Sequence, residues 1–176
     1  MIIYVIPYRT DKNLGKAYND IMRLVNDDDC VCFHDGDTSF LTPDFGTIIE
    51  SYHERFPDAV LTCKTNRIHP LSKQLDGHMD EKCDMRELMK KADHYRERQT
   101  VTPINVNEGM SGVLMVVPKR LWKEVPFAET KKALGVDTQF RIDLHRAGKK
   151  ILIMDAVLIF HGYRLLHGSH YKEHLS

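Results

Sequence analysis

Hydrophobic positions along the chain follow two different spacings. Short apolar runs bounded by polar residues are typical of buried strands, and apolar residues three or four positions apart are typical of amphipathic helices. The runs predict strands at 2–7, 29–34, 59–65, 113–117 and 150–160, where the last stretch is one strand or two. The helical spacing predicts helices at 14–25, 45–56 and 136–147, a further helix from 85 onward and a short amphipathic turn at 121–125.

Residues at the expected helix ends support this assignment. Asp11 or Asn13 can cap the first helix, and Thr42-Pro43-Asp44 offers a cap and a first-turn proline to the second. Asp84-x-x-Glu87 resembles a capping box. Because strands and helices alternate from the first residue, the pattern predicts an α/β domain with a mostly parallel central sheet flanked by helices. The polar, aperiodic stretch 66–83 predicts a long surface loop of the kind that often carries function.

Composition narrows the classes of protein that fit. The 176 residues suit one globular domain. Because 25 Lys and Arg balance 25 Asp and Glu, no charge field attracts nucleic acid or an anionic membrane surface. No apolar run approaches the ~18 residues of a membrane span, and the opening residues read as a strand and not as a signal peptide. We therefore expect a soluble, cytoplasmic protein with no nucleic-acid partner and no transmembrane segment.

The four cysteines fit a reducing compartment. Cys30 and Cys32 alternate with Val31 and Phe33 in an apolar run, where thiols behave as small buried hydrophobes. The alternative is a Cys-x-Cys zinc site, which no second closely spaced cysteine pair accompanies. We expect reduced, structural thiols.

Two aspartates follow the second predicted strand. Asp35 and Asp37 flank Gly36 at the carboxyl end of the run 29–34, the edge where open α/β sheets bind ligands. Alternation points both carboxylates to one side, and Gly36 lets a ligand approach the backbone. Because neighbouring carboxylates repel each other, the pattern predicts a divalent cation that bridges them to a diphosphate. The alternative is a plain Asp-Gly-Asp turn, but the apolar strand before it and the capped helix after it favour the cation site.

Several further segments match the motifs of one enzyme family. In chain order they are Ile6-Pro7-Tyr8-Arg9, Asn13-Leu14-Gly15-Lys16-Ala17-Tyr18-Asn19, Cys30-Val31-Cys32-Phe33-His34-Asp35-Gly36-Asp37, Leu41-Thr42-Pro43-Asp44-Phe45, Ser111-Gly112-Val113-Leu114, Gly135-Val136-Asp137-Thr138 and Phe160-His161-Gly162-Tyr163. On these segments the chain resembles the GT-A fold glycosyltransferases of the large inverting family, whose Asp-x-Asp motif binds a metal and the diphosphate of a nucleotide sugar. The first segment is also similar to the Pro-Phe-Arg start of the β-1,4-galactosyltransferases. Together the segments cover nearly the whole chain.

The resemblance implies a single GT-A-like domain that transfers a sugar from a nucleotide donor to a hydroxyl acceptor with inversion. Residues 1–65 would form the half that binds nucleotide and metal, and residues 66–176 the acceptor and catalytic half. A UDP-sugar is the first expectation for the donor, and a glycan or another hydroxyl compound is the expected acceptor.

The resemblance also implies roles for individual residues. Asp37, His161 and Asp35 would bind the metal, and an imidazole beside carboxylates favours Mn²⁺ over Mg²⁺. Asp137 stands in the place of the general base that accepts the proton of the acceptor hydroxyl. The implied nucleotide-sugar site consists of Pro7, Tyr8, Arg9, Asn13, Asn19, Asp35, Gly36, Asp37, Gly112 and Arg164.

Two positions depart from the family pattern. Arg9 is followed almost at once by Asn13, where the usual members insert a strand and a helix, so the nucleotide pocket is abbreviated. Val136 replaces the acidic residue that commonly precedes the base. Two of the implied roles have structural alternatives. Asp137 could serve only as a favourable charge at a helix start, and His161 could be a half-buried histidine at the end of a strand.

Two other functions fit part of the pattern. A sugar nucleotidyltransferase would also use an aspartate pair and a metal, but Pro7-Tyr8-Arg9 is not the Gly-rich loop expected after its first strand. A catalytically inactive module that binds nucleotide sugars or carbohydrates would need no base at Asp137. Loss of activity on substitution of Asp137 therefore distinguishes an enzyme from a binding module.

Overall fold

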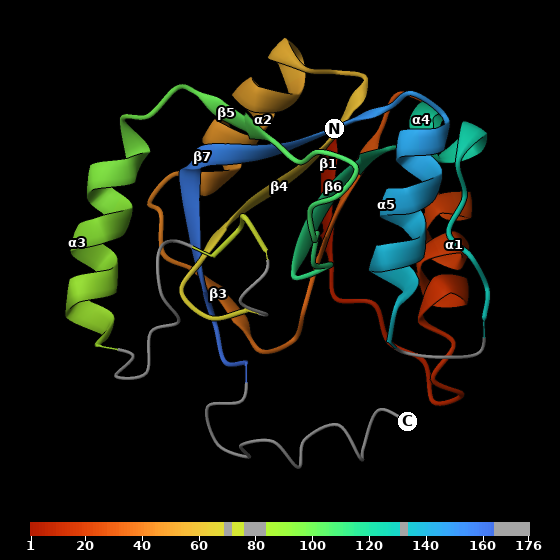
Figure 1. Cartoon of the computed structure of the whole chain (residues 1–176), viewed down its shortest axis with the longest axis horizontal. Helices are drawn as coiled ribbons and strands as arrows, with labels where there is room; N and C mark the ends of the chain where they lie inside the picture. Colours follow the sequence, from red (N-terminus) through yellow and green to blue (C-terminus); the bar gives the residue numbers. More distant parts are fainter. Residues whose placement is uncertain (69–71, 76–83, 131–133, 164–176) are drawn as a thin grey trace.

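One seven-stranded mixed sheet organises the described part of the molecule (Figure 1). The computed structural model describes residues 1–68, 72–75, 84–130 and 134–163. Within these ranges the strands are β1 (Ile2–Val5), β2 (Cys30–His34), β3 (Thr38–Phe40), β4 (Ala59–Thr65), β5 (Val101–Pro103), β6 (Leu114–Pro118) and β7 (Lys150–His161). The helices are α1 (Leu14–Leu24), α2 (Phe45–Arg55), α3 (Met85–Arg96), α4 (Lys119–Glu124) and α5 (Val136–Arg146).

The strand directions differ from the sequence prediction. Neighbouring strands lie in the order β1-β2-β6-β4-β7-β3, and β5 pairs with β7. β1 is parallel to β2 and β4 is parallel to β7, but β6 is antiparallel to both of its neighbours, and β3 and β5 are antiparallel to β7. The sheet is therefore mixed and not mostly parallel. A strand buried on both faces is apolar in either direction, so the run at 113–117 could not reveal that β6 opposes its neighbours.

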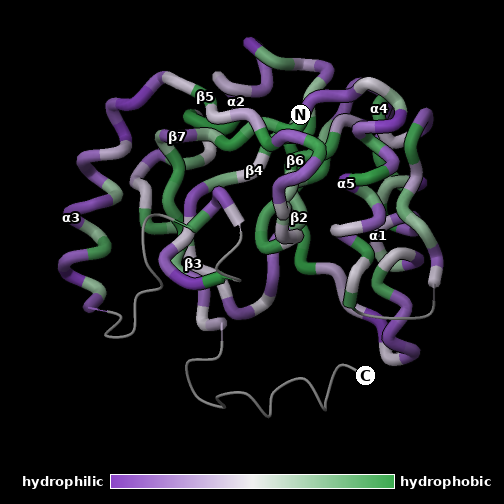
Figure 2. The backbone as a smooth tube through the Cα atoms, viewed as in Figure 1, coloured by the Kyte–Doolittle hydropathy of each residue, from purple (hydrophilic) through white to green (hydrophobic). Residues whose placement is uncertain are grey.

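Helices cover both faces of the sheet. One apolar layer includes residues of α1, α4 and α5, and the other includes residues of α2. Along β2, Val31 and Phe33 belong to the first layer, and Cys30 and Cys32 belong to the second. In Figure 2 the strands accordingly carry most of the hydrophobic colour, and the outer turns of the helices are hydrophilic. None of the helices within the described ranges is long and apolar enough to cross a membrane.

The long strand β7 connects the distant parts of the sheet. It pairs with β4 over Lys150–Ile159, with β5 over Leu152–Met154 and with β3 over Ile159–His161. A register shift between Cys63 and Lys64 interrupts the β4 pairing, and such irregularities bend a strand. Beyond the bend, α3 covers β7 through a small cluster in which Leu88 and Ala92 surround Leu158. β7 thus reaches from the central sheet to the edge that carries the candidate site.

The helix starts confirm two of the three predicted caps. The Asn13 side chain accepts a hydrogen bond from a first-turn amide of α1 at 3.0 Å, and Asp84 caps α3 in the same way. Thr42 does not cap α2, which begins after Asp44, because its hydroxyl instead accepts a hydrogen bond from the Leu158 amide of β7 at 2.9 Å. The sequence did not predict β3 and β5, because strands of three residues are too short to show a period.

The described cysteines are free and buried. Cys30, Cys32 and Cys63 lie in the strands, and Cys83 falls outside the described residues. Among the residues that the structure describes, no group of three metal-ligating side chains includes a cysteine. Nothing in this part of the chain supports the zinc alternative.

Cys30 contacts His53 of α2 at the start of β2. The Cys30 sulfur lies 3.1 Å from His53 Nε2. Burial raises the pKa of Cys30 to about 11 and lowers the pKa of His53, so the pair consists of a neutral thiol and a neutral imidazole.

The lowered pKa of His53 predicts a pH dependence of stability. The contribution of His53 to stability is complete above its unfolded pKa of about 6.5 and is lost as the pH falls below that value. We expect the wild type to lose more unfolding free energy between about pH 7 and about pH 5 than His53→Gln, which keeps an acceptor for the thiol but does not titrate. Urea unfolding at both pH values measures this difference, and equal losses in the two proteins would contradict the prediction.

Candidate functional site

Several strands end at one edge of the sheet. β2, β4 and β7 run in the same direction, because β4 is parallel to β7 and both β2 and β4 are antiparallel to β6. Their carboxyl ends therefore meet the amino end of β6, where His34 lies opposite Leu114. Residues that follow β2, β4 and β7 share this edge, which is where open α/β sheets bind ligands.

The short strand β3 joins the predicted carboxylates to the end of β7. The chain turns at Asp35, whose carbonyl accepts hydrogen bonds from the Thr38 amide and hydroxyl at 3.3 and 2.7 Å. β3 then places Thr38 opposite His161, and the Gly162 amide donates to the Asp37 carbonyl at 2.9 Å. A Cβ on Gly162 would lie 3.4 Å from that carbonyl oxygen, so glycine permits the close approach. This pairing brings Asp37 beside a histidine from the other end of the described chain.

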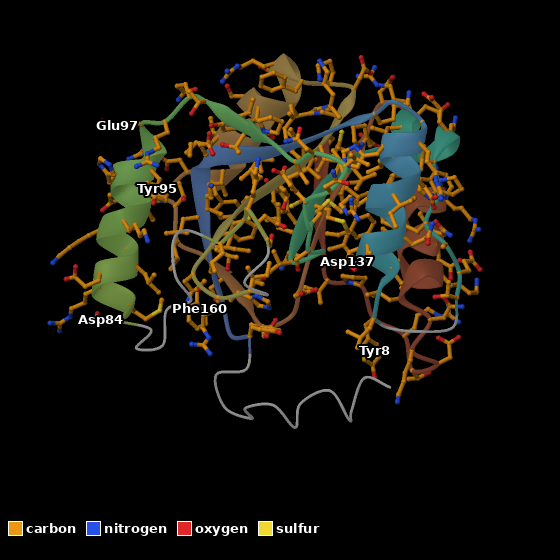
Figure 3. The ribbon with its side chains drawn as sticks, in the orientation of Figure 1. Tyr8, Asp84, Tyr95, Glu97, Asp137 and Phe160 are labelled. Atoms are coloured by element: carbon orange, nitrogen blue, oxygen red, sulfur yellow. The ribbon has the colours of Figure 1, made fainter. Side chains whose placement is uncertain are left out.

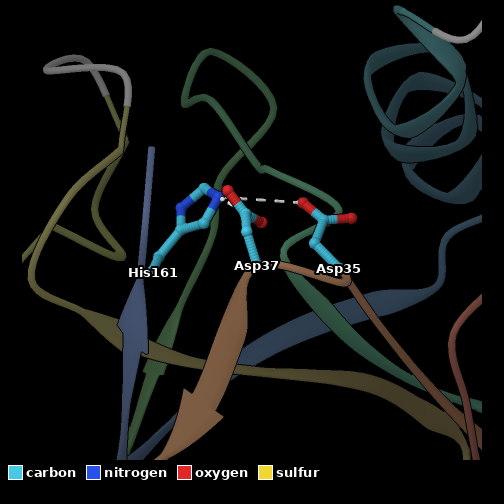
Figure 4. Close-up of side chains that lie close together, drawn as sticks. All are labelled: Asp35, Asp37 and His161. Atoms are coloured by element: carbon cyan, nitrogen blue, oxygen red, sulfur yellow. Dashed lines mark ion pairs between the residues drawn. The ribbon is translucent and has the colours of Figure 1, made fainter. Parts of the chain in front are cut away.

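Asp35, Asp37 and His161 form a cluster of potential metal ligands (Figure 4). Two carboxylate oxygens and one ring nitrogen all lie within 4.8 Å of one another. His161 Nε2 is 3.4 Å from Asp37 Oδ1 and 3.9 Å from Asp35 Oδ2. The histidine is buried and the aspartates are partly exposed, so the cluster is accessible from the carboxylate side.

Residues that follow β4 orient the imidazole of His161. Its Nδ1 atom donates a hydrogen bond to the Arg67 carbonyl at 2.8 Å, and its backbone amide donates to Asn66 Oδ1 at 2.8 Å. Because Nδ1 donates in this contact, Nε2 is the ring nitrogen that faces the carboxylates. Metal-binding histidines are commonly oriented by a carbonyl acceptor in this way.

The two aspartates differ in their electrostatic surroundings. The pKa of Asp35 is raised to about 6, mainly by burial, while His161 lowers it and Asp37 and Asp137 add to the rise. The pKa of Asp37 is lowered, mainly by its hydrogen bond with His161. A bound cation would relieve the repulsion between these carboxylates, so the electrostatics favour a cation at the cluster.

Asp137 lies in the first turn of α5 (Figure 3). Its Oδ2 accepts a hydrogen bond from the Gly112 amide at 2.9 Å, and its Oδ1 accepts one from the Thr138 amide at 2.7 Å. A Cβ on Gly112 would lie 3.3 Å from the Asp137 Cβ, so glycine again permits a close contact. The Asp35 amide donates to the carbonyl of Val113, the residue after Gly112, so Asp35 and Asp137 contact adjacent residues of one segment. The structure thus brings the predicted base, Gly112 and the predicted metal ligands to one edge.

The segment after β1 borders the aspartate turn. A Cβ on Gly36 would lie 3.6 Å from Ile6 Cγ2, so the start of this segment touches the turn between Asp35 and Asp37. Pro7 is half-buried, and Tyr8 is 80 % exposed. An exposed tyrosine ring two residues after Ile6 is available to stack on a ligand, and the nucleotide assignment of Tyr8 stays a prediction.

Arg9 is engaged within the chain. Its guanidinium donates to both carboxylate oxygens of Asp11 at 2.9 and 2.7 Å and to Asp20 Oδ2 at 3.0 Å. These contacts use three of the five N–H groups of the guanidinium, and the nucleotide role of Arg9 stays a prediction. Arg164 falls outside the described residues.

The two predicted asparagines serve the local structure. Asn13 caps α1. The buried Asn19 amide uses all of its hydrogen-bonding positions, accepting from Trp122 Nε1 at 2.8 Å and the Phe127 amide at 3.1 Å, and donating to the Phe127 carbonyl at 2.9 Å and Glu129 at 3.0 Å. These contacts tie α1 to the segment after α4, so a nucleotide contact by Asn19 stays a prediction.

Removal of the Asn19 amide is expected to destabilise the protein strongly. Asn19→Leu leaves the partly buried Trp122 ring nitrogen and the buried Phe127 amide without acceptors, so we expect a loss of about 3 kcal/mol in unfolding free energy. Urea unfolding measures the loss. The matched control Asp20→Asn, on the exposed side of α1, should cost less than about 1 kcal/mol. A loss of the same small size in Asn19→Leu would contradict a structural role for the amide.

Sequence reasoning missed the residues that support these groups. Asn66 directly follows the predicted strand 59–65, and a polar residue just after a buried strand is a readable signal for this edge. The fully buried Gln74 lies in a polar stretch without periodicity, so no sequence signal distinguished it from a surface residue.

Comparison with known proteins adds no family assignment. No protein-family model matches the chain, and no curated protein matches it in sequence. The function is therefore inferred from the site itself.

Proposed function

We propose that the protein is a metal-dependent glycosyltransferase that moves a sugar from a nucleotide-sugar donor to a hydroxyl acceptor. The proposal rests on the convergence of Asp35, Asp37 and His161 at the carboxyl edge of an α/β sheet. A GT-A-like fold is part of the proposal, and the Asp-Gly-Asp turn between the buried strand β2 and the short strand β3 supports it. We expect Mn²⁺ at the cluster, with Mg²⁺ as a weaker substitute, because the ligand set includes an imidazole.

The residues of the cluster suit the donor side of such a reaction. When bound, a divalent cation stabilises the negative charge that develops on a departing diphosphate. Asp35 and Asp37 offer hard oxygen ligands, and the oriented Nε2 of His161 offers a nitrogen ligand. The partly exposed carboxylates leave that side of the cluster open to a nucleotide diphosphate.

Asp137 suits the acceptor side. An acceptor hydroxyl must lose its proton as it attacks the anomeric carbon, and a positioned carboxylate can accept that proton. The amides of Gly112 and Thr138 hold one oxygen each and so fix the orientation of the carboxylate. In-line attack assisted by this base would invert the configuration of the transferred sugar.

Ligand-dependent stability and turnover test the proposal. Thermal unfolding is measured with UDP-, GDP- and dTDP-sugars, each with and without Mn²⁺, and a rise in Tm is expected only when the correct nucleotide sugar and Mn²⁺ are present together. Release of nucleoside diphosphate from the stabilising donor then measures transfer or hydrolysis. If no nucleotide sugar stabilises the protein, with or without cation, the proposal is wrong.

Other outcomes would select the alternative functions. Stabilisation without any turnover would favour a binding module. Release of pyrophosphate from a nucleoside triphosphate and a sugar phosphate would favour a nucleotidyltransferase.

A further inference from the structure

Residues 111–113 link the candidate base to the metal-ligand turn. The Gly112 amide donates to Asp137 Oδ2 at 2.9 Å, and the Val113 carbonyl accepts a hydrogen bond from the Asp35 amide at 3.2 Å. Adjacent residues of one segment therefore contact the candidate base and the metal-ligand turn, which a transfer reaction needs at a fixed separation. The conformation of residues 111–113 helps to set that separation.

The side chain of Gln74 holds this segment. Its Oε1 accepts hydrogen bonds from the Ser111 amide at 2.7 Å and the Ser72 hydroxyl at 3.1 Å. Its Nε2 donates to Thr62 Oγ1 at 2.6 Å and to the Ser111 carbonyl at 3.3 Å. The amide thus brackets both backbone polar groups of Ser111, as a neighbouring strand would, and all four of its hydrogen-bonding positions are used.

Gln74 is itself anchored to the sheet. Gln74 is fully buried. Its partner Thr62 in β4 in turn donates a hydrogen bond to the Leu114 carbonyl of β6 at 2.7 Å. A buried network in which every polar group has a partner is rigid, because each alternative arrangement would leave a group unsatisfied. The side chain of Gln74 therefore fixes the position of Ser111 relative to β4 and β6.

We propose that Gln74 is a positioning residue for Asp137, acting through Ser111 and Gly112. The amide fixes the backbone of Ser111, this fixes the direction of the Gly112 amide, and the Gly112 amide holds the Asp137 carboxylate toward the acceptor side. The inference rests on the proposed function, in which Asp137 is the base. Asp35 and Asp37 lie in the turn between β2 and β3, and His161 ends β7, so the metal ligands depend less on the Gln74 side chain.

The first test compares kinetics in matched variants. Gln74→Met removes the amide at similar length, and we expect kcat to fall about tenfold to a hundredfold, because a small displacement of a reacting group has effects of this size. The KM for the donor and the affinity for Mn²⁺ should stay within about twofold, since the metal ligands keep their supports. Thr102→Val is the control, because it also removes a side-chain hydrogen bond, to Asp155 in β7, at a position on β5, and it should leave kcat unchanged.

The second test needs no turnover. Amide hydrogen exchange reports the Gly112 contact directly, and the Gly112 amide should exchange about tenfold faster or more in Gln74→Met but not in Thr102→Val. Unchanged exchange at Gly112 overturns the proposal, and so does an unchanged kcat in an active enzyme. If the wild type shows no turnover with any donor, the proposed function fails, and the exchange result alone decides the role of Gln74. Gln74→Glu keeps both acceptor contacts, and it replaces Gln74→Met in both tests if that variant does not fold.

Discussion

Sugar transfer by Asp137→Asn is expected to be about a hundredfold to ten-thousandfold slower than transfer by the wild type, because general-base catalysis contributes factors of this size. Asparagine keeps the shape of the side chain and an oxygen that can accept from the Gly112 amide. It cannot accept the proton of an acceptor hydroxyl at neutral pH. The loss should appear in kcat, while the Tm shift caused by Mn²⁺ and donor should remain.

A second aspartate on the same helix provides the control for Asp137. Asp143 lies further along α5, where it pairs with Gln139 and Arg146. Asp143→Asn should therefore leave transfer unchanged. If Asp137→Asn also keeps more than about half of the activity, Asp137 acts only as a favourable charge at the start of α5, and the assignment of the base is wrong.

Asp37→Asn is expected to weaken Mn²⁺ binding by about a hundredfold or more. Changes to residues that merely orient metal ligands cost about tenfold to a hundredfold in affinity, so the loss of a direct carboxylate ligand should reach at least the upper end of that range. Asparagine retains a weak oxygen ligand but removes the negative charge that attracts the cation. Isothermal titration with Mn²⁺ measures the affinity.

Stability measurements separate lost binding from lost structure in Asp37→Asn. The Tm without metal should stay close to that of the wild type, because the contact that joins β3 to β7 uses the Asp37 carbonyl and not its side chain. The rise in Tm caused by Mn²⁺ should disappear. Asp58→Asn, an exposed aspartate paired with Arg120, should bind Mn²⁺ like the wild type. Full Mn²⁺ affinity in Asp37→Asn would show that the cluster is not the metal site.

Local pattern predicted the elements well where they are long enough to show a period. β4 has the predicted bounds, and α1 and α5 each end one residue before the predicted limit. The spacing of apolar side chains follows from which side of an element is buried, and this is a local property of the chain. β3 and β5 are too short to show a period. The direction of β6 relative to its neighbours cannot be predicted from the order of its residues.

The residues of the candidate site also differ in whether the local sequence pattern predicted them. Asp35 and Asp37 were recognised from adjacent residues, because a polar pair between a buried strand and a predicted helix is a local arrangement. The sequence resemblance suggested that His161 joins them, and the structure shows the three ligand atoms within 4.8 Å of one another. No local signal indicated that Gln74 is buried, since its burial depends on β4 and on the segment before β6.

The order of residues by itself determined the kinds of elements, their approximate limits and the chemistry available at the end of the second strand. Only the tertiary structure decided that β6 is antiparallel to its neighbours and that the pairing of β3 with β7 brings Asp37 beside the end of β7. It also decided that the side chains of Asn19 and Gln74 support the interior of the protein. The physical reason is the range of the interactions: periodicity records burial within one element, whereas strand order and convergent side chains depend on contacts between residues far apart in the chain.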